Sequence, residues 1–202
     1  MSANDNIEYL ESIVASQEYL ARAARCELDR VQGMQQPTPS DLLRARAFIH
    51  AHAGMNDQAI LELNALVSES NGGAPALLNK LAQVRLRRQE GDDVSAAAAA
   101  AGRVLELPDL TAGDKWLAHQ NLALACWSAG DLDEATDHAK HALEQIDDPR
   151  THVLLAHLSG GAAGAKTYAA QSVPELALQV PNRSELSANA LVPWVSAMEP
   201  MM

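Results

Sequence analysis

The sequence predicts an all-α fold, an array of antiparallel helix pairs, and three observations support this prediction. First, 48% of the 202 residues are hydrophobic but only 3% are aromatic. Together with abundant alanine, this favours closely packed helices over sheets, which prefer β-branched and aromatic side chains. Second, residues 116–149 contain two helical patterns joined by a tight turn. Third, a Gly-x-x-x-x-Ala turn occurs four times, with its glycines at 54, 91, 130 and 164, which gives spacings of 37, 39 and 34 residues.

The clearest helix pair lies at residues 116–149. Small and apolar side chains share one face of its first helix, and Gly130 follows it, where a left-handed residue readily ends a helix. Asp131 and Glu134 form an Asp-x-x-Glu capping pattern for the second helix. Alanines at 135, 139 and 142 form the inner stripe of that helix. This segment resembles a tetratricopeptide repeat (TPR), a helix–turn–helix unit of about 34 residues.

Residues 1–36 form the first predicted region, a long N-terminal helix. Apolar residues recur at three- and four-residue steps from Ile7 to Leu28, and Gly33 with the following QQPTP segment ends the pattern. Two roles are open for this helix. It either caps the array by packing on the first repeat, or it pairs with a second copy of the chain to make a homodimer.

Residues 37–180 form the second predicted region, a row of TPR-like repeats. We divide it into helix pairs at about 40–73, 75–110 and 114–149 and a degenerate pair at 150–180. Residues 181–202 form the last region, a C-terminal helix that caps the array, followed by a short tail.

Local signals mark the ends of the repeat helices. Thr38-Pro39-Ser40-Asp41 combines a Thr cap, Pro at the first helical position and Asp at the third. In the second pair, Pro75 opens the first helix and Gly91 ends it, after which Asp92 or Asp93 caps its partner. We interpret these aspartates as exposed cap residues.

Charge and composition limit the classes of partner and compartment. The chain carries a formal charge of −11 with a pI near 5.0, which argues against nucleic acid as a partner because phosphate contacts need clustered Lys and Arg. The sequence has no apolar run of the length that spans a membrane and no signal-peptide pattern. Cys26 and Cys126 lack C-x-x-C spacing and are interpreted as buried, reduced thiols. We therefore expect a cytoplasmic protein.

Catalytic and metal-binding signals are weak. We find no phosphate loop, H-E-x-x-H or G-x-S-x-G motif, and we expect no enzymatic activity and no cofactor. Glu134, His138 and His141 share one helix face, and zinc could use them with a fourth ligand from a neighbour. The same spacing is typical of a solvated helix face, which we prefer, so no metal site is predicted. His119 is expected to lie apart from the other histidines.

The TPR resemblance implies a right-handed superhelix whose first helices line a concave groove that takes a peptide or helix of a partner. The groove-lining positions carried over to this chain are Arg44, Phe48 and His52 from the first pair, Asn79, Gln83 and Arg87 from the second, and Gln120, Asn121, Leu124 and Trp127 from the third. Asn121 stands where some family members hold a peptide backbone, to which an amide can both donate and accept. In a second interpretation, Phe48 and Leu124 belong to the core and Trp127 packs between repeats.

Three classes of function fit these features. The leading one is a non-enzymatic module that binds a partner's peptide or helix, and the size, acidity and N-terminal helix are similar to those of TPR chaperones in bacterial type III secretion. The alternative is an assembly or regulatory scaffold of a larger bacterial complex, which would bind folded partners. A metal-dependent enzyme at His138 and His141 is the third class, and it requires stoichiometric zinc.

Overall fold

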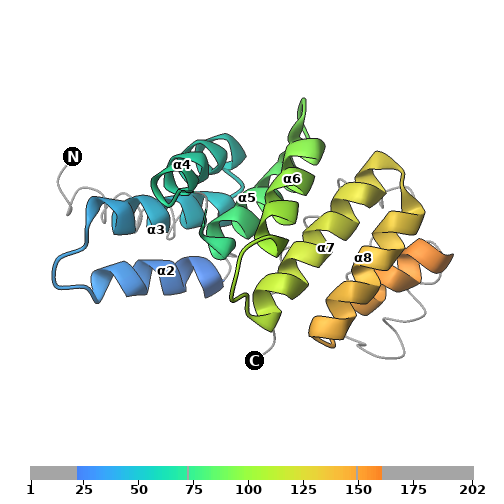
Figure 1. Cartoon of the computed structure of the whole chain (residues 1–202). Coiled ribbons are helices and arrows are strands. Elements are labelled where there is room, and N and C mark those ends of the chain that lie inside the picture. Colours follow the sequence, from blue (N-terminus) through green and yellow to red (C-terminus); the bar gives the residue numbers. More distant parts are fainter. Residues whose placement is uncertain (1–21, 72, 149, 161–202) are drawn as a thin grey trace.

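A computed structural model describes residues 22–71, 73–148 and 150–160 (Figure 1). All regular secondary structure in these residues is helical, which confirms the predicted all-α class for this part of the chain. The helices are α2 (Arg22–Gln32), α3 (Pro39–His52), α4 (Asn56–Glu69), α5 (Pro75–Arg88), α6 (Asp93–Leu105), α7 (Ala112–Ala129) and α8 (Leu132–Gln145), followed by a helical stretch at 150–160.

Some predictions fall on other parts of the chain. The N-terminal helix is described only from Arg22, and most of the degenerate pair and all of the C-terminal helix at 181–202 lie outside the described residues. Within the described ranges, no helix combines the length and the apolar character needed to cross a membrane.

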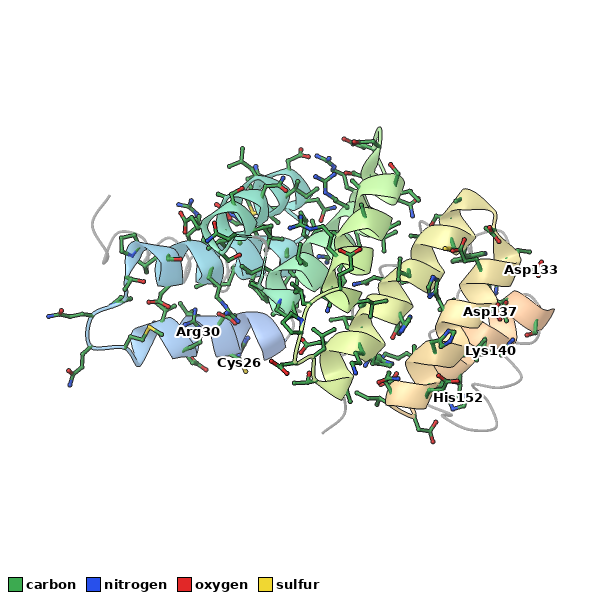
Figure 2. The ribbon with its side chains drawn as sticks, in the orientation of Figure 1. Cys26, Arg30, Asp133, Asp137, Lys140 and His152 are labelled. Carbon is green, nitrogen blue, oxygen red and sulfur yellow. The ribbon has the colours of Figure 1, made fainter. Side chains whose placement is uncertain are left out.

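The helices pack in chain order. Each helix from α2 to α7 contacts the next one along the chain, and α5 also contacts α7 directly. Figure 1 shows the resulting row, with α2 at one end and α8 at the other. In Figure 2, Cys26 and Arg30 on α2 mark one end of the row, and Asp133 and Lys140 on α8 mark the other. The described chain is therefore a helical, repeat-like array.

Two helices begin with the same capping box. At the start of α3, the Asp41 N–H donates to Thr38 Oγ1 and the Thr38 N–H donates to Asp41 Oδ2, both at 3.1 Å, which confirms the start signal predicted there. Thr111 and Asp114 repeat this exchange at 3.1 and 3.2 Å. Because that box begins α7 at Ala112, the first helix of the third pair starts earlier than the predicted 114.

The turn between α7 and α8 follows the predicted scheme. Gly130 has φ of +89° and ends α7, and the Glu134 N–H donates to the Asp131 side chain at 3.2 Å. The end of α5 differs from the prediction, because the helix stops at Arg88 and Gln89 takes the left-handed conformation before Gly91 is reached. The Asp93 carboxylate accepts from the Glu90 N–H at 3.1 Å and fixes the chain in this earlier turn.

Alanine fills the α7–α8 interface. The inner stripe predicted for α8 is confirmed, since its three alanines have no exposed surface. Ala118 and Ala123 on α7 are also fully buried, although α7 packs against α5 and α6 as well as α8. Methyl groups at these positions let the two helices approach closely, because the distance between packed helices depends on the side chains at the contact. These buried alanines are Ala118, Ala123, Ala135, Ala139 and Ala142.

Candidate functional site: a cationic cluster on α3 and α5

Helical spacing collects basic side chains from two helices. Arg44, Phe48 and His52 occur at four-residue steps along α3 and therefore share one face of it. Lys80 and Arg87 occur seven residues apart on α5, which again places them on one face. We call Arg44, Lys80 and Arg87, together with the nearby rings of Phe48 and His52, the cationic cluster.

The ring of Phe48 holds two of these cations in place. The Arg44 Cζ atom and the Lys80 Nζ atom each lie 5.3 Å from the ring centroid, within the range of cation–π contacts. Phe48 is half-buried and packs against the hydrophobic core with its other atoms. It therefore contacts both the core, as the second sequence interpretation requires, and the charged groups at the surface.

Burial and mutual repulsion change the proton affinities in the cluster. Burial, reinforced by the charges of Lys80 and Arg87, lowers the pKa of His52 to about 3, so its ring is neutral at pH 7. Burial and the charge of Arg87 lower the pKa of Lys80 to about 8, against an opposing effect of Glu27. Burial also lowers the pKa of Arg87 from its usual value. In all three groups, burial is the largest cause of the lowered pKa.

No carboxylate of the described residues forms an ion pair with the cluster. None of their ion pairs involves Arg44, Lys80 or Arg87. Glu27, whose charge acts on Lys80, is bound to Arg30 at 3.0 Å. The Nε atoms of Arg44 and Arg87 are buried and have no hydrogen-bond partner. Such groups are costly to leave unsatisfied. Because Arg44 and Arg87 are only half-buried as whole residues, their guanidinium groups can still donate to an external acceptor.

On a different face of α5, two arginines are paired with carboxylates. Arg88 donates to Asp93 through Nε at 2.7 Å and Nη2 at 2.9 Å, and to Asp57 through Nη1 at 2.7 Å. Arg85 Nη1 lies 3.4 Å from Asp93 Oδ1. Burial raises the pKa of Asp93, but hydrogen bonds from Arg88 and the Glu90 N–H outweigh it and lower this pKa overall. The expected exposed cap at Asp93 is therefore wrong, because the side chain is fully buried in an ion-pair network.

Several predicted partner-binding residues lie in the interior instead. Asn121 Nδ2 donates to the Asn79 backbone O at 3.2 Å and to Asn79 Oδ1 at 3.3 Å, and Asn79 Nδ2 donates to the Asp114 backbone O at 3.2 Å. Both amides are buried between α5 and α7. They bind helix to helix, so in this structure neither is open to a partner's backbone. We call this chain of hydrogen bonds the amide bridge.

The remaining predictions for α7 resolve in a similar way. Gln120 is buried, and its Oε1 accepts from Thr151 Oγ1 at 3.4 Å. Leu124 is buried in the hydrophobic core, as the second interpretation expects. Trp127 packs edge-on against His157 at 5.0 Å between ring centroids, so it contacts the next helical stretch. On α5, Gln83 stays half-buried.

The structure thus brings together Arg44, Phe48, His52 and Arg87 from the predicted set, and separates the others from them. Sequence reasoning missed Lys80. The predicted groove-lining face of α5 begins at Asn79. If that face is moved by one residue along the helix, it begins at Lys80 instead. The charge of Lys80 three residues before Gln83 was the available signal.

Histidines gather at the other end of the array, between α7 and α8. The Nδ1 atoms of His119 and His138 lie 3.2 Å apart, and the His119 ring stacks on His141 at 5.3 Å. The expectation that His119 lies apart from the other histidines is therefore wrong, because the α7–α8 turn brings it opposite α8. Burial and the neighbouring histidines lower the pKa of His119 to about 4.

The two cysteines differ from each other. Cys26 is exposed on α2, so the expectation of a buried thiol is wrong there (Figure 2). Cys126 on α7 is half-buried, and burial together with the charges of Glu134 and Asp131 raises its pKa to about 11.

The described residues form an all-α helical array with a cationic cluster that makes no ion pair within them. Comparisons with models of known protein families, with curated proteins and with solved structures find no match to this chain. The functional conclusion therefore rests on the chemistry of the residues themselves.

Proposed function

We propose that the chain is a TPR-like protein-interaction module that binds an acidic segment of a partner protein across α3 and α5. The observation that carries this proposal is the cationic cluster, in which two buried guanidinium Nε atoms and one ammonium group have no carboxylate partner among the described residues. A partner's Asp or Glu side chain, or its C-terminal carboxylate, supplies the missing acceptor.

The chemistry of the cluster suits a carboxylate on a partly apolar segment. Arg44 and Arg87 offer planar forks for bidentate hydrogen bonds, and Lys80 adds a point charge. Phe48 provides an apolar surface for a neighbouring side chain. Because the Debye length is about 8 Å at physiological salt, the net negative charge elsewhere on the chain is largely screened at this site.

A secretion chaperone is a narrower proposal within this class. It is supported by the small size, the acidity and the helical repeats of the chain. A chaperone of this kind keeps a secreted substrate in solution when the two are co-expressed, and a substrate that stays insoluble regardless would argue against it.

The direct test measures binding of a short fluorescent peptide of mixed Glu and Leu residues to the full-length chain by anisotropy. We expect the affinity to fall when the Glu residues are replaced by Gln, and to fall with rising salt. Arg87→Gln removes one charge-assisted hydrogen-bond donor and should weaken binding by about tenfold, which corresponds to about 1.4 kcal/mol. Arg44→Gln should act similarly.

Lys140→Gln is the matched control, because it removes one positive charge from the exposed surface of α8, far along the row from the cluster (Figure 2). It should leave the peptide affinity unchanged. Equal affinity for the Glu and Gln peptides, or equal effects of Arg87→Gln and Lys140→Gln, would overturn the proposal. A folded partner that protects the chain in limited proteolysis while no acidic peptide binds would favour the scaffold alternative instead.

A further inference from the structure

The turn between α7 and α8 places three metal-ligating side chains together. Cys126 lies four residues before Gly130 and Glu134 lies four residues after it, so the two face each other across the antiparallel pair. His138 lies one helical turn beyond Glu134 on the same face of α8. A thiol, a carboxylate and an imidazole therefore converge from two rigid helices.

Their ligand atoms are close to coordination geometry. The ligand atoms of Cys126, Glu134 and His138 all lie within 4.8 Å of one another, and His138 Nε2 is 4.0 Å from Glu134 Oε1. Around a tetrahedral zinc ion with bonds of about 2.0–2.3 Å, such atoms lie about 3.3–3.8 Å apart. Since Glu134 is exposed, a change of its rotamer can close the remaining gap.

A neighbouring histidine already orients the imidazole. His119 Nδ1 lies 3.2 Å from His138 Nδ1, so one of these nitrogens donates to the other. When His138 carries its proton on Nδ1, it donates to His119, and its Nε2 is left as a free ligand on the side of Cys126 and Glu134. Histidine ligands of metals usually have such a partner on the second ring nitrogen.

His141 does not belong to this ligand set, although the sequence pattern includes it. Its Nδ1 lies 2.9 Å from the Asp137 backbone O, and its ring stacks on His119. The third ligand is the half-buried Cys126, which comes from a different helix and cannot be found from the spacing along α8.

The surrounding charge favours a cation. The negative charge of Asp131 interacts electrostatically with Cys126, and that of Asp137 interacts with His138. One thiolate and one carboxylate together neutralise a divalent ion, and the thiol proton is released to solvent on binding.

We propose that Cys126, Glu134 and His138 bind one Zn²⁺ ion, with His119 as a positioning residue and a water molecule in the fourth position. Sulfur and nitrogen ligands favour zinc over magnesium or calcium, which prefer oxygen. The site lies on α7 and α8, so this inference does not depend on the proposed peptide-binding function of α3 and α5.

The test is a titration of the full-length, metal-free chain with Co²⁺, a spectroscopic substitute for Zn²⁺. We expect one equivalent to bind, to produce a thiolate-to-cobalt charge-transfer band, and to be displaced by Zn²⁺ but not by Mg²⁺. Cys126→Ser should abolish the band, and His138→Gln should remove stoichiometric binding. His119→Gln should weaken binding by about tenfold or more, as the loss of an orienting partner does.

Two variants serve as controls. Cys26→Ser removes the other thiol, which is exposed on α2, and His141→Gln removes the nearby histidine that lies outside the ligand set. Both should bind Co²⁺ as the natural chain does. Circular dichroism of each variant establishes that the helices remain folded. A band that persists in Cys126→Ser, disappears in Cys26→Ser, or is absent from the natural chain would each disprove this site.

Discussion

Two faces of α5 carry basic side chains that differ in whether a carboxylate of the described residues pairs with them. On one face, Arg85 and Arg88 end on the buried carboxylate of Asp93, and Arg88 reaches Asp57 as well. On the other face, Lys80 and Arg87 meet Phe48 and His52 and receive no carboxylate from the described residues. The difference arises from the neighbouring elements. The turn into α6 supplies Asp93 to Arg85 and Arg88, whereas the carboxylate that acts on Lys80, Glu27 of α2, is paired with Arg30.

This contrast separates two uses of positive charge. The paired face contributes to folding, since removing one member of a buried ion pair leaves the other member charged and desolvated. Under the proposed function, the other face contributes little to folding and binds another molecule. Substitutions on the two faces should therefore have opposite consequences for stability and for binding.

The largest effect is expected from Asp93→Asn. This change leaves Arg85 and Arg88 without their shared carboxylate and should lower the free energy of unfolding by about 3 kcal/mol. Urea unfolding followed by circular dichroism measures it. Asp57→Asn is the matched control, because this partner of Arg88 is largely exposed, and its loss should cost less than about 1 kcal/mol. Equal losses in the two variants would remove the distinction between the buried and the exposed carboxylate.

A smaller loss is expected at the amide bridge. Asn121→Ala removes two hydrogen bonds to Asn79 inside the α5–α7 contact and should lower the free energy of unfolding by about 1–3 kcal/mol. Gln83→Ala, at a half-buried position on α5, should change it by less than about 0.5 kcal/mol. If Asn121→Ala were as harmless as Gln83→Ala, a partner-contacting role for this amide would regain support.

The cationic cluster should also make stability depend on pH. His52 has a pKa of about 3 in the folded chain and about 6.5 when unfolded, so between these values the unfolded state binds more protons. The contribution of His52 to the free energy of unfolding is therefore fully present above about pH 7 and is lost as the pH falls through this window. We expect a loss of about 1–2 kcal/mol, because the ring is half-exposed and solvent screens part of the effect. His52→Gln should remove this part of the decline. The other histidines are present in both chains, so the difference between the two pH curves reports His52 alone.

The smallest change in stability is expected from Arg87→Gln, although this variant should lose affinity for acidic peptides. The substitution removes a charge that no described residue compensates, so the free energy of unfolding should stay within about 0.5 kcal/mol or increase slightly. Thermal unfolding compared with that of Arg88→Gln is the measurement. A loss at Arg87 as large as the loss at Arg88 would show that both faces of α5 serve folding.

Helix ends and the alanine stripe could be predicted from sequence because they depend on nearby residues. Thr38 with Asp41, and Gly130 with Asp131, act within a few positions of each other. The capping box at Thr111 carries the same local signal, although the predicted third pair begins only at 114.

The burial and the partners of polar side chains depend on how the helices pack against one another. A local sequence pattern does not predict this packing. Asn79 and Lys80 are neighbours, yet one is enclosed against α7 and the other lies beside Phe48. The sequence around Asp93 is that of an ordinary helix cap, and only the folded structure places its carboxylate beside Arg88. Likewise, His119 and His138 are 19 positions apart and meet only because α7 and α8 are antiparallel.

The enclosed alanines between α7 and α8 have a consequence for how the sequence can change over time. In most proteins the least replaceable interior positions hold large side chains, whereas here several of them hold a single methyl group. Nearly every substitution at Ala135, Ala139 or Ala142 adds volume at a position with no exposed surface, and overpacking is itself destabilising. A deep mutational scan should therefore show its strongest depletion along this stripe, with glycine and serine as the best-tolerated replacements.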